Sequence, residues 1–299
     1  MAKINIANID DLRVVCVPYE RTHDHHTIDQ RVAETYTAND YHNKPKTLEE
    51  ARAKGQTHFN GLSSSFTDIR TYQTPSGIFV AADIMPTRYL IGQAMRDYMK
   101  AHPELLTEII EATSPNMAGV SVIVPTKYKG QYVIIAQVKG KALGSGQIHG
   151  AAVAGNVKGK YVLEENRPLI RSLQDECSEE LGLNLRFLNS TAFTLWFGEE
   201  ETGQMNVACV ARNVAADTVL ETYERSAQNK EYEKREVKGL ALIPVENPKS
   251  ILDSIEVFLP GKEPGWTTEK RELRPYTHAL LEYLVEKENQ SFLLQKAGF

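Results

Sequence analysis

Short apolar runs bounded by turn residues alternate with amphipathic stretches along the chain. In the first third, the apolar runs predict strands over residues 12–17, 65–72 and 77–83. The last two are joined by Gln-Thr-Pro-Ser, which is typical of a hairpin turn. Helical spacing of apolar residues begins at Pro86 and again after Pro103. Thr47 and Glu50 have the spacing of a capping box and indicate a further helix start.

The pattern changes at Ser114-Pro115-Asn116, after which the runs become strongly apolar. These runs predict strands over residues 119–125, 131–138, 185–188, 191–197, 205–210 and 236–245. Pro168 is well placed as the first residue of a helix, and residues 274–286 form a second amphipathic one. Strands on both sides of a central helix predict an α/β fold class, with a mixed sheet and helices on both faces. We divide the chain into a smaller α+β domain of unknown role, residues 1–115, and a second domain, residues 116–299.

The helix after Pro168 carries three glutamates on one face. Glu176, Glu179 and Glu180 have the spacing i, i+3 and i+4, so their carboxylates are neighbours. Three like charges destabilise a bare helix, and a hard cation such as Mg²⁺ or Mn²⁺ reverses that effect because it prefers oxygen ligands. The alternative is an acidic face that is simply solvated, which is common on helices.

The opposite face of this helix is apolar and ends at a glycine. Leu173, Cys177 and Leu181 repeat every four residues and predict a buried stripe. Gly182 follows at the position where a left-handed residue ends a helix.

This stretch resembles the core of the Nudix box, Gly-x5-Glu-x7-Arg-Glu-U-x-Glu-Glu-x-Gly-U, where U is aliphatic. The residues that match its last part in register are Glu176, Cys177, Glu179, Glu180, Gly182 and Leu183. Two positions depart from the pattern. Asp175 stands where the family has Arg, and Arg167 stands where strict spacing puts the upstream Glu.

The resemblance implies a Nudix-type α/β/α sandwich over roughly residues 116–290. It also implies a diphosphohydrolase that acts on the acid anhydride linkage of a nucleoside diphosphate derivative. In the family, divalent metal bound by the glutamates neutralises the diphosphate while water attacks phosphorus. Carried over by position, Glu179 and Glu180 are the principal ligands of Mg²⁺ or Mn²⁺, and Glu176 is a third or water-mediated ligand.

The residues before the helix match the Nudix box less closely than the helix does. Gly155 matches the glycine that opens the box, with its carbonyl toward the metal and the substrate. The loop to Pro168 is then longer than in the family, which leaves the upstream Glu open between Glu164 and Glu165. His149 lies on the strand before the glycine, where it either contacts a substrate phosphate or is satisfied within the core.

The family draws its general base from later loops, so the base stays open. The candidates are Glu199, Glu200, Glu201, Glu231, Glu233 and Glu236.

The replaced arginine motivates a second hypothesis. In the family, that arginine holds the glutamates by charge-assisted hydrogen bonds, which Asp175 cannot do. Arg171, one turn earlier, is placed to compensate in part. The alternative to hydrolysis is a catalytically degenerate Nudix domain that binds a nucleotide-like ligand or a protein partner.

The composition of the chain limits the classes of ligand and partner that we expect. The 299 residues have an apolar fraction of 41% and a formal net charge of -5, which argues against a general nucleic-acid binder. Cys16, Cys177 and Cys209 are widely spaced and odd in number, as expected for reduced thiols in the cytoplasm. Because no apolar run approaches ~18 residues, we expect no membrane association. A small-molecule ligand is expected, and a homodimer stays open.

Overall fold

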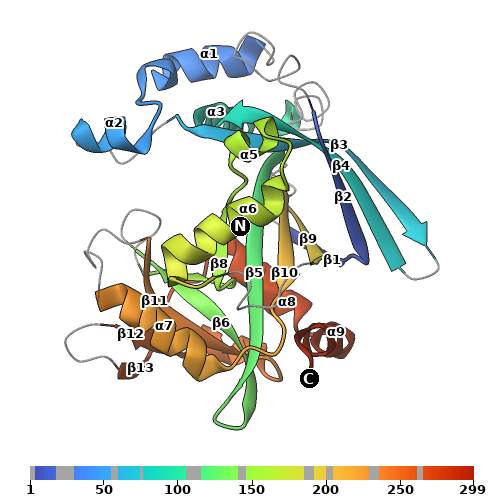
Figure 1. The fold of residues 1–299 in the computed structure, drawn as a ribbon, viewed down its shortest axis with the longest axis vertical. Helices are drawn as coiled ribbons and strands as arrows, with labels where there is room; N and C mark the ends of the chain where they lie inside the picture. The colour runs from blue at the N-terminus through green and yellow to red at the C-terminus, as the bar shows by residue number, and fades with distance from the viewer. Residues whose placement is uncertain are drawn as a thin grey trace.

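The computed structural model describes residues 4–17, 30–54, 60–74, 77–105, 116–140, 146–184, 192–199, 205–228, 236–260 and 265–299. It is a mixed α/β structure built on one large sheet (Figure 1). The main path through the sheet is β1 (Ile4–Asn8), β9 (Phe193–Glu199), β10 (Met205–Val210), β5 (Asn116–Tyr128), β6 (Gln131–Lys139), β11 (Val237–Pro244), β12 (Ile255–Leu259) and β13 (Gly265–Glu269). Along this path β10 and β5 are parallel and the other pairs are antiparallel. The predicted α/β fold class is therefore confirmed.

Helices cover both faces of this sheet. On β5, Val120, Val122 and Val124 face one core, which also contains residues of α6 (Pro168–Glu176) and α7 (Ala216–Gln228). Ile123, between them in sequence, faces a second core with α8 (Pro275–Tyr283) and α9 (Lys287–Ala297). This division follows from the period of two along a strand, because successive side chains point to opposite faces. The result is the three-layer arrangement expected from the sequence.

The N-terminal third forms a long hairpin with helices beside it. Its elements are β2 (Asp11–Cys16), α1 (Gln30–Ala38), η2 (Tyr41–Asn43), α2 (Leu48–Ala53), β3 (Leu62–Thr74), β4 (Gly77–Arg88), α3 (Tyr89–Ala101) and η3 (Pro103–Leu105). The predicted hairpin of β3 and β4 is confirmed, and so is Thr47 as an N-cap, because the Glu50 N–H donates to Thr47 Oγ1 over 3.1 Å. The Glu50 carboxylate accepts from the Lys46 N–H rather than from the Thr47 N–H of a full capping box. The helix predicted from Pro86 is present as α3, but it begins at Tyr89 rather than at Pro86. Pro86 lies within β4 opposite Ser64, beyond the part of β4 that pairs with β2, where a missing N–H is tolerated.

Hydrogen bonds of the sheet cross position 115, where we divide the chain. Phe66 of β3 pairs with Asn116 of β5, and β1 pairs with β9 along its whole length. Phe66 also belongs to the core beneath α6, and its ring lies 5.5 Å from that of Trp196. The division into two domains remains a prediction, but the N-terminal segment shares the sheet and the core of the rest.

The C-terminal part differs in detail from the pattern. The sequence predicts one helix over residues 274–286, but α8 ends at Tyr283 and α9 begins at Lys287. A short helical turn, η8 (Pro248–Leu252), lies between β11 and β12. The predicted strand over residues 185–188 lies outside the described residues. Within the described ranges, no helix is long and apolar enough to cross a membrane.

Candidate functional site

The acidic helix is the best-predicted element of the site. Pro168 is its first residue, and Leu173, Cys177 and Leu181 are fully buried, as expected. Its last turn, η5 (Cys177–Leu181), is a π-helical turn, which the sequence pattern did not predict. Gly182 ends the helix with φ 69°, a left-handed conformation that suits glycine. Turns of this kind are frequent at functional sites and change the direction of the side chains that follow.

Glu180 points into the protein and is fully engaged there. Its Oε2 accepts hydrogen bonds from Gln137 Nε2 over 2.6 Å and from the Ala154 N–H over 2.9 Å. Its Oε1 accepts from Lys139 Nζ over 3.0 Å. The side chains of Lys139 and Glu180 are each only 3% exposed. Both oxygens of this predicted metal ligand therefore have protein partners.

Sequence reasoning missed Gln137 and Lys139. They lie two apart near the end of β6, so they share a face, and both reach the acidic helix. A signal was present in the sequence. Polar residues at alternate positions at the end of an otherwise apolar strand predict side chains that meet a buried polar group.

Lys158 gathers the remaining carboxylates of the helix. Its Nζ lies 3.0 Å from Asp175, 2.9 Å from Glu179 and 3.7 Å from Glu176. Burial lowers the pKa of Lys158, but hydrogen bonds to Glu179 and Asp175 and the charge of Glu176 outweigh burial and raise this pKa to about 12. The ammonium is thus charged throughout the physiological range.

Asp175, in place of the family's arginine, has partners of its own. The hydroxyl of Tyr161, in α5 (Gly159–Leu163), donates to it over 2.8 Å, and Lys158 donates over 3.0 Å. Burial raises the pKa of Asp175, but these two partners outweigh burial and lower the pKa below its ordinary value. Arg171 pairs with Glu164 instead and stacks on the Tyr161 ring at 4.1 Å. Asp175 is therefore contacted by Lys158 and, at 3.7 Å, by Lys160, and not by Arg171 as the sequence suggested.

Glu176 packs directly on Gly155, a residue of β8 (Val153–Asn156). A Cβ at Gly155 would lie 2.3 Å from Glu176 Cδ, so this approach requires a glycine. Burial, followed by the charge of Glu180, raises the pKa of Glu176 to about 8, and Lys158 opposes that shift. The structure brings the two predicted site residues together. Whether the Gly155 carbonyl faces a metal or a substrate remains a prediction.

His149 lies in the core, on the short strand β7 (Ile148–His149). Its ring stacks on Tyr276 at 4.6 Å, and its Nδ1 accepts from the Ala151 N–H over 3.3 Å. Burial, followed by the charges of Lys139 and Arg274, holds its pKa well below the ordinary value. This placement is the one expected of a satisfied core histidine, and substrate binding by His149 remains a prediction.

Of the candidate general bases, Glu236 is the one whose surroundings are described. It precedes β11 and is close enough to Glu176 for its charge to raise the pKa of that carboxyl. The Glu199 side chain lies outside the described residues, as do Glu200, Glu201, Glu231 and Glu233. Of the two candidates for the upstream Glu, Glu164 pairs with Arg171 and Glu165 has a positive φ of 49°. The identity of the base remains open.

The predicted donor set, Gly155, Glu176, Glu179 and Glu180, does not fit a divalent metal in this arrangement. Two lysine ammonium groups already hold the carboxylates. Among the described residues, no group of three or more His, Cys, Asp or Glu side chains is arranged to hold a metal ion. Mg²⁺ requires free oxygen ligands in near-octahedral geometry, which these paired side chains do not offer.

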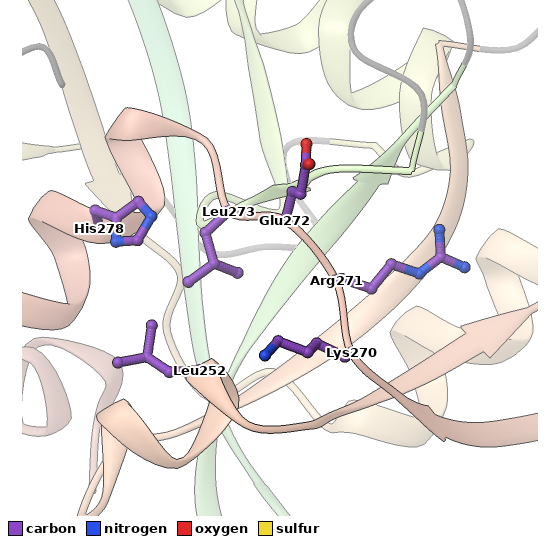
Figure 2. Close-up of a pocket in the computed structure, with 6 residues that line it drawn as sticks. All are labelled: Leu252, Lys270, Arg271, Glu272, Leu273 and His278. Carbon is purple, nitrogen blue, oxygen red and sulfur yellow. The ribbon is translucent and has the colours of Figure 1, made fainter.

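A separate pocket of about 330 Å³ lies between β13 and α8 and has both apolar and charged side chains in its walls. It is lined by Leu252, Lys270, Arg271, Glu272, Leu273 and His278. Figure 2 shows Arg271 and Glu272 directed away from Leu252 and Leu273. None of the predicted site residues lines this pocket, so it is distinct from the carboxylate cluster.

Comparison with known proteins gives a fold likeness alone. No family model matches the chain, and no curated protein matches it. Among solved structures, it is similar to the crystal structure of a MutT/nudix family protein from Enterococcus faecalis. The sequence identity is 14%, the alignment covers 68% of this chain and 78% of that one, and the TM-score is 0.31. The functional argument therefore rests on the geometry of the site.

Proposed function

We propose that this chain is a catalytically degenerate Nudix-like domain that binds a nucleotide-like ligand, a nucleoside diphosphate derivative, without hydrolysing it. The observation that supports this function best is the buried pair of Glu180 and Lys139. Glu180 is the predicted principal metal ligand, and its two oxygens are satisfied by Lys139, Gln137 and the Ala154 N–H.

The energetic argument concerns what metal binding would break. Diphosphate hydrolysis of this type needs divalent metal to neutralise the non-bridging oxygens. To reach a metal, Glu180 would have to leave Lys139 buried and unpaired. Breaking a buried ion pair in this way costs roughly 3–5 kcal/mol. The resting arrangement therefore opposes metal-dependent catalysis.

Asp175 supports the same function independently. The family's arginine would bring a positive charge to the acidic helix, whereas Asp175 adds a negative one. Asp175 in turn engages Lys158 and Tyr161. The positive charge of Lys158 therefore partly neutralises the carboxylates of the helix, so an external cation would stabilise them less.

A second candidate function is the metal-dependent diphosphohydrolase, using Mg²⁺ or Mn²⁺. Its support is the close approach of Gly155 and Glu176, which matches the positions of the glycine and a glutamate of the Nudix box. In this function Glu176 and Glu179 would hold the metal, and Lys158 would have to move away from both.

One screen separates the two functions. The protein is incubated with nucleoside triphosphates, nucleotide sugars, ADP-ribose and dinucleotides, with Mg²⁺ and then Mn²⁺, while phosphate-containing products and thermal unfolding are followed. We expect at least one compound to raise the unfolding temperature without product, because a ligand that binds only the folded state stabilises it. Metal-dependent product that disappears in Glu179→Gln would establish the hydrolase instead. If no compound gives product and none raises the unfolding temperature, a protein partner is favoured instead.

A further inference from the structure

Three carboxyl groups converge on a single point beside the acidic helix, and that point is occupied by the Lys158 ammonium. Asp175 and Glu179 lie 3.0 and 2.9 Å from Nζ, and Glu176 lies 3.7 Å from it. Carboxyl oxygens are the ligands that hard divalent cations prefer. With the ammonium in place, however, these three described side chains are not arranged to hold a metal ion. Here the position is filled by a side chain of the protein itself.

The backbone holds Lys158 at this place. Its N–H donates to the buried Ser172 Oγ over 2.8 Å, which joins the start of α5 to α6. Gly155, three residues earlier, allows Glu176 to pack beneath the ammonium because it has no Cβ. The lysine and the carboxylates therefore meet through fixed elements on both sides.

Lys158 differs from Lys139 in how easily it can leave. The Lys139 side chain is 3% exposed, whereas that of Lys158 is 24% exposed and Glu179, one of its partners, is largely open to solvent. A displaced Lys158 ammonium can reach water, but a displaced Lys139 ammonium cannot. Of the two, Lys158 is the cation whose removal would open a position for another ion.

We propose that Lys158 is a tethered cation that takes the place of a divalent metal, and that it excludes such a metal from the site formed by Asp175, Glu176 and Glu179. A dication and an ammonium cannot share this position because their charges repel strongly at a few ångströms. The inference adds to the proposed function the means by which metal is kept out, and it rests on that function only for the absence of hydrolysis. The inference has a consequence of its own: removal of the Lys158 ammonium should raise the affinity of the protein for a divalent metal when no nucleotide is present.

The test is a titration with Mn²⁺ alone, in which free Mn²⁺ is followed by electron paramagnetic resonance. Wild type, Lys158→Met and Lys160→Met are compared. Lys160 is the matched control, because its Nζ lies 3.7 Å from Asp175 and its side chain is 57% exposed. We expect Lys158→Met to bind Mn²⁺ at least about tenfold more tightly than wild type, which corresponds to the loss of one nearby positive charge. Lys160→Met should stay within about twofold of wild type, as for an exposed charge.

Two further variants place the new ion. Lys158→Arg keeps the positive charge and should bind Mn²⁺ as weakly as wild type. Lys158→Met/Glu179→Gln should lose the gained affinity, because one of the three carboxylates is removed. Circular dichroism confirms that each variant is folded, and Lys158→Gln replaces Lys158→Met if the latter is not.

Two results would overturn the inference. One is tight binding of Mn²⁺ by wild type that is lost in Glu179→Gln, which would show that Lys158 does not exclude the metal. The other is a folded Lys158→Met or Lys158→Gln protein with the affinity of wild type. Because no nucleotide is present, these results are independent of the product screen, and either proposal can fail without the other.

Discussion

Lys139 and Glu180 form an ion pair of 3.0 Å in the protein interior, between the end of β6 and the π-helical turn of the acidic helix. The pair joins a strand of the central sheet to the helix that carries the predicted metal ligands. Its partners in the same hydrogen-bond network are Gln137 and the Ala154 N–H.

Removal of one partner of this pair is expected to be costly. Lys139→Met leaves Glu180 charged and buried, and we expect the free energy of unfolding to fall by roughly 3–5 kcal/mol. Urea unfolding measures the loss. The double variant Lys139→Met/Glu180→Gln should recover much of it, because Gln keeps an acceptor without the charge. A loss below about 1 kcal/mol, as in exposed ion pairs, would contradict the buried character of this one.

The contact between Gly155 and Glu176 leads to a second prediction. Gly155→Ala places a methyl group 2.3 Å from Glu176 Cδ, so side chain or strand must shift. We expect a loss of about 1–3 kcal/mol, as in other overpacked sites. Gly265→Ala is the control, because a Cβ there has no atom within 4 Å. In a Glu176→Ala background the Gly155→Ala substitution should become nearly neutral, and an undiminished loss would assign the effect to the strand backbone.

The raised pKa of Glu176 leads us to predict that the stability of the protein depends on pH. Its folded pKa of about 8 lies above its ordinary value of 4.5, because of burial and then the charge of Glu180, opposed by Lys158 and reinforced by Glu179 and Glu236. The folded state therefore keeps a proton that the unfolded chain has released. This contribution to stability is complete below about pH 4.5 and is lost as the pH rises through about 8.

Thermal unfolding of wild type and Glu176→Gln, compared from roughly pH 5 to roughly pH 9, measures this contribution. The difference in unfolding temperature should move in favour of Glu176→Gln as the pH rises. Parallel curves for the two proteins would show that Glu176 titrates as an ordinary glutamate.

The hydrogen bond from Tyr161 leads to a prediction about the pKa of its neighbour Asp175. Tyr161→Phe removes the 2.8 Å hydrogen bond but keeps the ring, which lies against Arg171 at 4.1 Å. We expect a loss of about 1 kcal/mol in the free energy of unfolding and a rise in the pKa of Asp175 toward its ordinary value. Carboxyl ¹³C chemical shifts, followed as the pH is lowered, report that pKa directly. An unchanged titration would mean that Lys158 alone sets it.

Local pattern predicted the acidic helix well. Leu173, Cys177 and Leu181 are buried as expected, and Gly182 has the left-handed φ that a helix end requires. These features depend on residues close together in sequence, so spacing alone carries them. The helix start at Pro86 failed for the opposite reason. Its place in β4 is set by pairing with Ser64, which the local pattern does not contain.

The partners of the carboxylates were beyond the sequence pattern. Lys139 and Glu180 are separated by 41 positions and meet only because β6 and the helix are packed together. The motif supplied the glutamates, but the choice between an external cation and an internal lysine depends on that packing. For this reason the resemblance to the Nudix box alone could not decide between catalysis and binding.

The pairing of β1 with β9 has a consequence for how the chain folds. Ile4 lies opposite Glu199, so the strand at the start of the described chain can pair with β9 only after about two thirds of the chain has been made. Such distant contacts slow folding, because a long loop must close before they form. Until then β9 presents an unpaired edge, the kind of surface on which chains aggregate. A change that weakens residues 4–8 should therefore reduce the yield of folded protein more than its stability.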